Sequence, residues 1–315
     1  MSLTTFVAVQ HIRERIREEF AKPRLEDKPQ MLAPPVTKNY ALVGIAFDYL
    51  LRFHLQYRNP KAHARNWIAE HGMVFLKTKK ELFEQACGLM EQARLDYSLF
   101  LQTGKQTDSL VRSVVFLAKM DSLYRIGPFH PVFLPGQEGK SFRSKFLTPD
   151  ERDEADLQKL IAVLPKGIFN SKRVCILNPT FGNASALVGG GDADLVLDDM
   201  LIEVKTTKNF ELSRYCFNQL IGYYCLYKIG GIDGARRNCR IRKIGVYFSR
   251  HAYLWSVTTK ELAEDEKFER FARWFKRAAK QSEQWEVSPR VSARKKKSFA
   301  GFIKASTKGR KQQLN

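Results

Sequence analysis

The sequence predicts a mixed α/β protein, in which a large helical N-terminal region precedes a strand-containing segment and a basic tail. Apolar residues recur at helical spacing through most of residues 4–160. After residue 170, short apolar runs alternate with Gly, Pro, Asn and Asp, a pattern typical of strands and turns. Because 44% of the residues are hydrophobic and 12% aromatic, the chain can build a packed core, and a wholly disordered protein is excluded.

The N-terminal region, residues 1–170, is expected to be mainly helical. Three of its segments carry apolar residues at helical spacing: 41–56, 79–102 and 107–126. Thr148 and Glu151 form a capping-box pattern around Pro149, which predicts a further helix with Thr148 as N-cap. Pro165 and Gly167 should end that helix.

Residues 171–286 are expected to form a second unit that contains the sheet. Its short apolar runs predict five strands: 173–177, 192–197, 200–205, 241–248 and 253–257. A helix is predicted over 211–229, and the capping box of Thr258 and Glu261 should open another that runs to about residue 281. The aromatic stripe of that last helix is expected to face the core, and it comprises Phe268, Phe271, Trp274 and Phe275.

The charge of the chain points to a polyanionic partner. Lys and Arg number 53 against 33 Asp and Glu, so the net charge is +20. Residues 287–315 are predicted to be a disordered basic tail, and a nucleic acid, most naturally DNA, is the expected partner because phosphate contacts release condensed counterions. The tail residues expected to bind phosphates are Arg294, Lys295, Lys296, Lys297, Lys308, Arg310 and Lys311. A solubilising or targeting tail is the alternative.

The remaining composition indicates a reduced, cytoplasmic protein without a membrane span. No apolar run approaches the ~18 residues that a span needs. The N-terminus lacks the basic and apolar regions of a signal peptide, and the five cysteines are odd in number and unclustered. Nothing in the sequence indicates protein partners.

The two runs around Asp198 and Asp199 predict a β-hairpin with a charged face. Asp tolerates the positive φ of a two-residue turn. Pairing outward from the turn places Leu195 and Ala193 on an apolar face. The other face then carries Asp194 opposite Glu203, and Asp192 opposite Lys205.

Two directly opposed carboxylates destabilise a sheet unless something offsets their repulsion. A hard divalent cation, Mg²⁺ or Mn²⁺, would do so, and Lys205 would stand beside it. Such a set resembles a phosphodiester hydrolysis centre. The alternative is a solvated acidic face with one salt bridge from Asp192 to Lys205.

Three motifs resemble those of the PD-(D/E)XK nuclease superfamily, in particular its RecB-type branch. Asp194 followed by Glu203-Val204-Lys205 is similar to the D…(D/E)xK signature. The strand begins with Gly191-Asp192-Ala193-Asp194, which resembles the branch's G-x-x-D pattern. Gln219 and Tyr223, which share a helix face at i, i+4, resemble its Q-x-x-x-Y motif.

This resemblance implies a restriction-endonuclease-like core, a mixed sheet flanked by helices. Asp194 and Glu203 would hold the metal with help from the Val204 carbonyl, Lys205 would position the attacking water or neutralise developing charge, and Gln219 and Tyr223 would brace the site. The branch often carries G-x-x-x-H in an early helix, and here Asp48 takes the place of that histidine after Gly44. Asp48 is thus either a metal ligand or a helix-surface charge, and whether Asp192 or Asp194 is the main ligand stays open.

The expected function is a Mg²⁺-dependent nuclease. An inactive nucleic-acid-binding protein on a nuclease fold and an RNA-processing nuclease are the alternatives. The histidines and cysteines lack the spacing of zinc or iron–sulfur sites, and the glycines at 189–191 do not match a Walker A loop.

Overall fold

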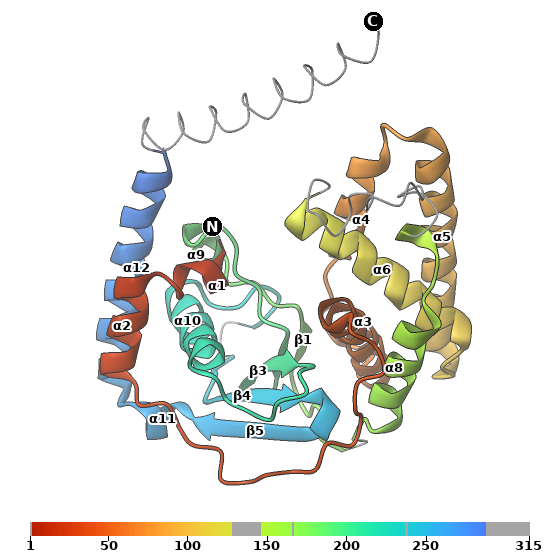
Figure 1. The fold of residues 1–315 in the computed structure, drawn as a ribbon. Helices are drawn as coiled ribbons and strands as arrows, with labels where there is room; N and C mark the ends of the chain where they lie inside the picture. The colour runs from red at the N-terminus through yellow and green to blue at the C-terminus, as the bar shows by residue number, and fades with distance from the viewer. Residues whose placement is uncertain (1, 128–145, 166, 237–238, 288–315) are drawn as a thin grey trace, which may run out of the picture.

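In the computed structural model of the chain, the described residues are 2–127, 146–165, 167–236 and 239–287. The predicted phosphate-binding residues of the tail, from Arg294 to Lys311, lie outside them. The described part is a mixed α/β protein with a five-stranded mixed sheet and a helical N-terminal region. Figure 1 shows two groups of elements that approach each other at the base of the molecule and stand apart at the top.

The predicted helices and strands are present in the predicted order with shifted ends, and the structure adds helices that the sequence did not predict. The helices of six or more residues are α2 (Gln10–Glu19), α3 (Tyr40–Arg58), α5 (Lys80–Thr103), α6 (Asp108–Ile126), α8 (Glu151–Ala162), α10 (Arg214–Gly230) and α12 (Asp265–Val287). The shorter ones are α1 (Leu3–Phe6), α4 (Ile68–Gly72), α9 (Asn183–Leu187), α11 (Thr259–Leu262) and the 3-10 turns η1 (Met73–Leu76) and η3 (Ser249–His251). The strands are β1 (Cys175–Leu177), β2 (Leu195–Leu197), β3 (Met200–Lys205), β4 (Lys243–Phe248) and β5 (Tyr253–Thr258). Within the described ranges, no helix is both long and apolar enough to cross a bilayer.

The strands lie in the order β1-β2-β3-β4-β5. All neighbours are antiparallel except β3 and β4, which run parallel and are joined through α10. The β2–β3 hairpin has the predicted register, with Leu195 opposite Ile202 and Leu197 opposite Met200. Asp198 has φ 51°, as the turn requires, and its carboxylate accepts hydrogen bonds from the Arg173 and Val174 amides, which fastens the turn to the chain before β1.

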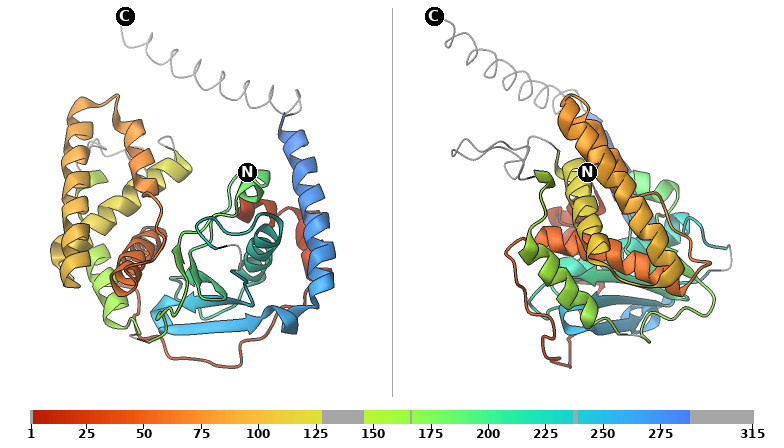
Figure 2. Two further views of the ribbon diagram at one scale, coloured as in Figure 1. Left: turned by 180° about the vertical axis from the view of Figure 1, so that it is seen from behind. Right: turned by 90° about the vertical axis from the view of Figure 1, so that its right-hand side faces the viewer.

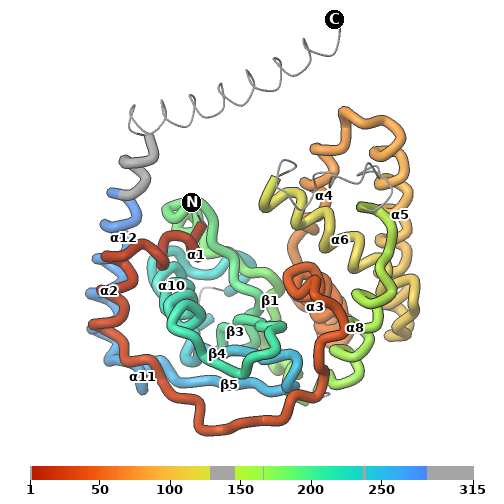
Figure 3. Tube along the Cα trace, viewed as in Figure 1, coloured from red at the N-terminus to blue at the C-terminus, as the bar shows by residue number. Residues whose placement is uncertain are grey.

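Two hydrophobic cores cover the two faces of the sheet, because successive strand residues point to opposite sides. Leu195 and Ile202 pack with α3, α5, α6 and α8. Val196 and Leu201 pack with α1, α2, α10 and α12, so the first twenty residues pack with the second half of the chain (Figures 1 and 3). The views in Figure 2 show the same two layers of helices from behind and from the side.

Three local expectations differ from the structure. The N-cap of α8 is Asp150, whose carboxylate accepts from the Arg152 amide, and it replaces the predicted Thr148 because the helix starts after the proline. The Thr258 capping box is formed, but it opens only α11, and a break at Ala263 precedes α12. Ala193 packs in the hydrophobic core on the α10 side of the sheet, whereas Leu195 packs in the core on the opposite side. The reason is that β2 begins only at Leu195, so the strand alternation of side chains does not extend back to Ala193.

One buried arginine joins the two groups of elements at their base. Arg250, which follows β4, is fully buried and pairs with the equally buried Asp156 of α8 through bonds of 2.7 and 3.1 Å. Its guanidinium also donates to the carbonyls of Ala33 and Thr206. Thr206 directly follows Lys205, so Arg250 holds the end of β3 as well.

Replacing Arg250 with Met should destabilise the protein by about 3–5 kcal/mol, because Asp156 is left as an uncompensated buried charge. The double variant R250M/D156L should recover part of that loss, and the Ala33 and Thr206 carbonyls would still lack their donor. Urea unfolding measures both effects. As a control, R94M breaks the exposed Arg94–Glu70 pair and should cost less than about 1 kcal/mol. An equal cost for R250M and R94M would show that the buried pair is not structurally important.

Candidate active site

The strand β3 and the helix α10 bring together four of the predicted catalytic residues. Alternation along β3 puts Glu203 and Lys205 on the face that α10 covers. The Lys205 Nζ donates to Glu203 Oε1 at 2.6 Å and to Gln219 Oε1 at 3.2 Å. The Gln219 Nε2 in turn donates to the Tyr223 hydroxyl at 2.9 Å. These contacts form one continuous polar chain beside the sheet.

Asp194 joins this group from the residue just before β2. Its Oδ2 accepts a hydrogen bond of 2.6 Å from the Val204 amide, which sets the carboxylate beside β3. Its carbonyl accepts from the amide of Asn178, a residue with φ 55° that Asn tolerates better than most residues. The loop after β1 thus positions Asp194.

A cavity of about 330 Å³ lies next to these residues. One wall comes from α3 and α6, and the other comes from α1, α10 and the loops before β2. Its polar lining comprises Ser2, Thr4, Asp48, Asp121, Arg125, Asn178, Asp192, Asp194, Gln219 and Tyr223. Gly222 lets α1 approach α10, since a Cβ there would lie 2.9 Å from the Leu3 side chain.

The acidic groups of the site repel one another. Loss of hydration and the neighbouring Glu203 carboxylate raise the pKa of Asp194 to about 8. Burial raises the pKa of Tyr223 well above its ordinary value, and the charges of Glu203 and Asp194 add to this shift, so its hydroxyl stays protonated. Burial alone would lower the pKa of Lys205, but the Glu203 carboxylate outweighs it, and the net pKa is raised. Lys205 therefore stays positively charged.

One carboxylate oxygen of Glu203 is buried and makes no hydrogen bond. Its side chain is 5% exposed, and its Oε2 atom is buried without a hydrogen-bond partner. Burying a charged oxygen without a partner costs free energy. A hydrogen-bond donor or a cation could partner this atom.

Asp48, the third predicted metal ligand, lines the same cavity from α3. It forms an ion pair of 2.8 Å with Arg52, one turn along the helix. Burial raises its pKa to about 7 against the opposing effect of Arg52, and the charges of Asp194 and Asp121 add to the rise. Asp48 thus faces the site and already has a cationic partner.

Asp192 does not pair with Lys205 as the hairpin register predicted. Because β2 starts only at Leu195, the backbone of Asp192 instead forms an isolated antiparallel β-bridge with Thr180. The side chain of Asp192 forms an ion pair with Arg125, with 3.5 Å between Oδ2 and Nη2. The Arg125 Nε donates to the buried Asp121 at 2.5 Å. Arg125 thereby links α6 to the loop that carries Asp192.

The sequence offered few signals for the second wall of the cavity. Nothing in the local pattern marked Arg125 or Asp121, which lie in a largely buried helix. The same holds for Ser2 and Thr4 at the N-terminus. Asn178 belongs to an Asn-Pro pair, which indicates a turn and does not by itself mark a cavity wall.

The donor set suits a hard cation only in part. In the described portion of the chain, no group of three or more His, Cys, Asp or Glu side chains is arranged to hold a metal ion. Asp194 and Glu203 form a pair, and Mg²⁺ often uses one or two carboxylates together with water and substrate phosphate. The unpartnered Oε2 of Glu203 fits that use.

The chain has no recognisable relative in the comparisons with known proteins. No family model matches the sequence, and neither a curated protein nor a solved structure matches the chain.

Changing Asp194 to Asn should stabilise the metal-free protein increasingly as the pH rises. The pKa of Asp194 is raised in the folded state, from 3.8 to about 8, so the folded protein binds this proton more tightly than the unfolded chain does. The carboxylate therefore lowers the free energy of unfolding as the pH rises from 5 to 8, by an amount on the order of 3–4 kcal/mol. Urea unfolding in EDTA at pH 5 and pH 8 measures the difference.

The control for this test is D199N, a carboxylate in the hairpin turn outside the cavity, which should show no such gain. If D194N gained no stability over wild type between pH 5 and pH 8, Asp194 would not be held in the repulsive environment described above.

Proposed function

We propose that the protein is a metal-dependent nuclease that hydrolyses phosphodiester bonds, with DNA as the first substrate to test. Asp194 and Glu203 would hold Mg²⁺ or Mn²⁺, with help from the Val204 carbonyl. The observation that carries the proposal is the buried, unpartnered Oε2 of Glu203 beside the raised-pKa carboxylate of Asp194. A nucleic-acid-binding role alone gives no reason to place two carboxylates together where a polyanion must come.

A metal ion held there would polarise the scissile phosphate and lower the pKa of a water molecule. Lys205 contributes a permanent positive charge. Its ammonium has three protons, and the bonds to Glu203 and Gln219 use two of them. The third is free to meet a phosphate oxygen or the attacking water, where it would stabilise developing negative charge.

Gln219 and Tyr223 act through Lys205 and are positioning residues. Gln219 accepts from the Lys205 ammonium and donates to the Tyr223 hydroxyl, which fixes the amide orientation. Tyr223 is in turn packed against Phe181, with ring centroids 5.9 Å apart. Arg125, 47% exposed at the cavity wall, is suited to bind a second phosphate of the same strand.

The strand order supports the further proposal that residues 171–286 form a restriction-endonuclease-like core. An antiparallel β1-β2-β3 unit carries the acidic residues, and a helix then crosses to a parallel β4. The carboxylates and the lysine come from β3 and the start of β2, as the resemblance to PD-(D/E)XK nucleases implies. Helices α3 and α6 would then be the wall that restricts access to the site.

The test is incubation of the purified protein with single-stranded, double-stranded and branched DNA and with RNA, each with Mg²⁺, Mn²⁺ or EDTA. Cleavage is expected with the metal ions and not with EDTA. D194N, E203Q and K205A should each lower the rate at saturating substrate by at least about 100-fold, because each removes a charge used at the reacting phosphate. Binding to the same substrates in EDTA should persist.

Matched controls are available on the exposed loop that follows the site. K208A and E211Q remove one positive and one negative charge close to Lys205 in sequence and should leave cleavage unchanged. Wild-type rates in all three site variants would refute the proposal, and so would cleavage that EDTA does not inhibit. Binding without any cleavage would favour an inactive binding protein, whereas cleavage of RNA alone would make it a ribonuclease.

A further inference from the structure

A second cavity, of about 370 Å³, lies between α2 and α12 on the outer side of the molecule. We call it the α2/α12 groove. It is lined by Arg15, Glu19, Lys267, Arg270, Phe271, Arg273, Trp274 and Arg277. It shares no residue with the cavity at Asp194, and α10 lies between α2 and α12 on one side and α3 and α6 on the other (Figure 1).

The groove is strongly cationic. Five of its lining residues are Lys or Arg, and only Glu19 is acidic. That carboxylate is already engaged, since Arg15 lies 2.6 Å and Lys267 3.6 Å from it. Arg273 lies 3.9 Å from Glu269, which also pairs with Lys228 at 2.9 Å. The five cationic side chains of the groove therefore outnumber the acidic side chains that pair with them, and the groove carries a net positive charge.

Three arginines follow one another along the outer face of α12. Arg270, Arg273 and Arg277 are exposed and spaced three and four residues apart, so they stand one per helical turn. From Arg270 to Arg277 the helix rises about 10.5 Å. Since one strand of DNA carries a phosphate about every 3.4 Å along its axis, the row spans about three phosphate intervals, and the three arginines can reach phosphates of one strand. Arginine binds each with a planar fork of donors.

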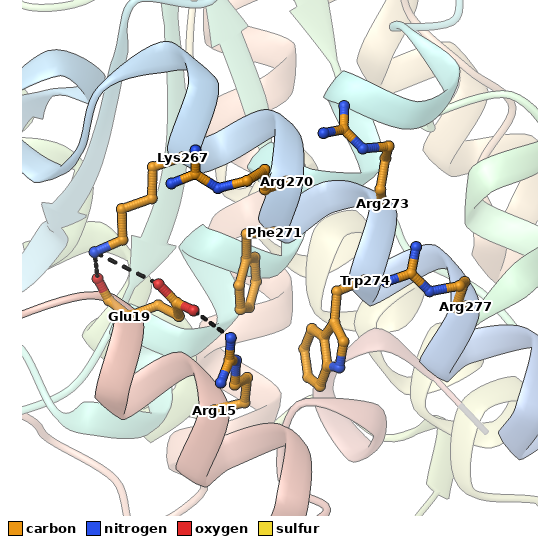
Figure 4. A pocket seen from close by; sticks show the side chains of 8 residues that line it. All are labelled: Arg15, Glu19, Lys267, Arg270, Phe271, Arg273, Trp274 and Arg277. Atoms are coloured by element: carbon orange, nitrogen blue, oxygen red, sulfur yellow. Dashed lines mark hydrogen bonds and ion pairs between the residues drawn. The ribbon is translucent and has the colours of Figure 1, made fainter.

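An aromatic side chain accompanies this row. Figure 4 shows Phe271 and Trp274 projecting from α12 toward Arg15 of α2. Phe271 is buried, whereas Trp274 is half-buried and packs on it with ring centroids 5.1 Å apart. A cationic groove with an accessible aromatic ring is the combination that binds single-stranded nucleic acid, with bases or sugars against the ring and phosphates on the cations.

The same helix is poorly suited to a lipid surface. An amphipathic helix binds a membrane through its apolar face. The apolar face of α12 comprises Phe268, Phe271, Phe275 and Ala279, and all four are buried against α10 and the N-terminal helices. Only the cationic face remains for a partner.

We propose that the α2/α12 groove binds the phosphate backbone of a single strand of nucleic acid, with Arg270, Arg273 and Arg277 on phosphates of that strand and Trp274 beside a base. The proposal deepens the proposed nuclease function by naming a second contact with the substrate, at a distance from the reacting phosphate. The N-terminal segment connects the two places, because Ser2 and Thr4 line the first cavity and Arg15 lines the groove.

The test is fluorescence anisotropy of a labelled 20-nucleotide single-stranded DNA with the full chain in EDTA, where no turnover occurs. The variant R270Q/R273Q/R277Q should bind at least about tenfold more weakly at 0.15 M salt. The slope of log K against log salt should fall by about 2.1, at ~0.7 per phosphate contact for a single strand. The single variant R277Q should lower the slope by about 0.7.

The matched control is K61Q/K77Q/K105Q, which removes the same charge from exposed positions on the other group of helices. It should keep most of the wild-type affinity. Equal losses in the two triple variants, or an unchanged salt slope in the groove variant, would overturn the proposal. So would a loss of binding to phosphatidylserine vesicles with DNA binding intact, because the groove would then serve a membrane surface. Since cleavage is measured separately with Mg²⁺, failure of this proposal and failure of the nuclease proposal are distinguishable.

Discussion

The buried pair of Arg250 and Asp156 is the interaction on which the arrangement of the molecule depends. It is the one place in the described residues where a fully buried guanidinium and a fully buried carboxylate meet, and the two come from opposite groups of elements. A buried pair of this kind is costly to separate and adds little when it is merely formed. Its consequence is geometric: α8 and the helices packed on it are held at a set position relative to the end of β3, where Lys205 lies.

The position of the N-terminal helices relative to the sheet determines which side chains line the cavity at the candidate site. Its acidic residues belong to the sheet, but half of the cavity wall belongs to α3 and α6, which contribute Asp48 and Arg125. Neither group of elements forms the cavity alone. The lining therefore joins side chains from the first 130 residues to side chains from the last 140.

The site also concentrates unfavourable electrostatics that the rest of the fold must tolerate. Burial and the nearby Glu203 charge raise the pKa of Asp194 to about 8, and Oε2 of Glu203 is buried without a hydrogen-bond partner. A protein selected only for stability would replace such residues with apolar ones. The two carboxylates lie beside the charged Lys205, whose ammonium donates to Glu203 at 2.6 Å. The cationic α2/α12 groove lies outside this region and would add substrate affinity without disturbing the carboxylates.

Local sequence determined much of this protein by itself. The alternation of apolar residues around Asp198 predicted the hairpin and its register, and the i, i+4 spacing of Gln219 and Tyr223 placed them on one helix face. The hairpin register and the shared helix face depend only on the periodicity of side chains along a strand or a helix. The partner of Asp192, the second wall with Arg125 and the α2/α12 groove were decided by the tertiary structure alone. Each joins residues far apart in the chain, and no local period encodes which buried surfaces will meet.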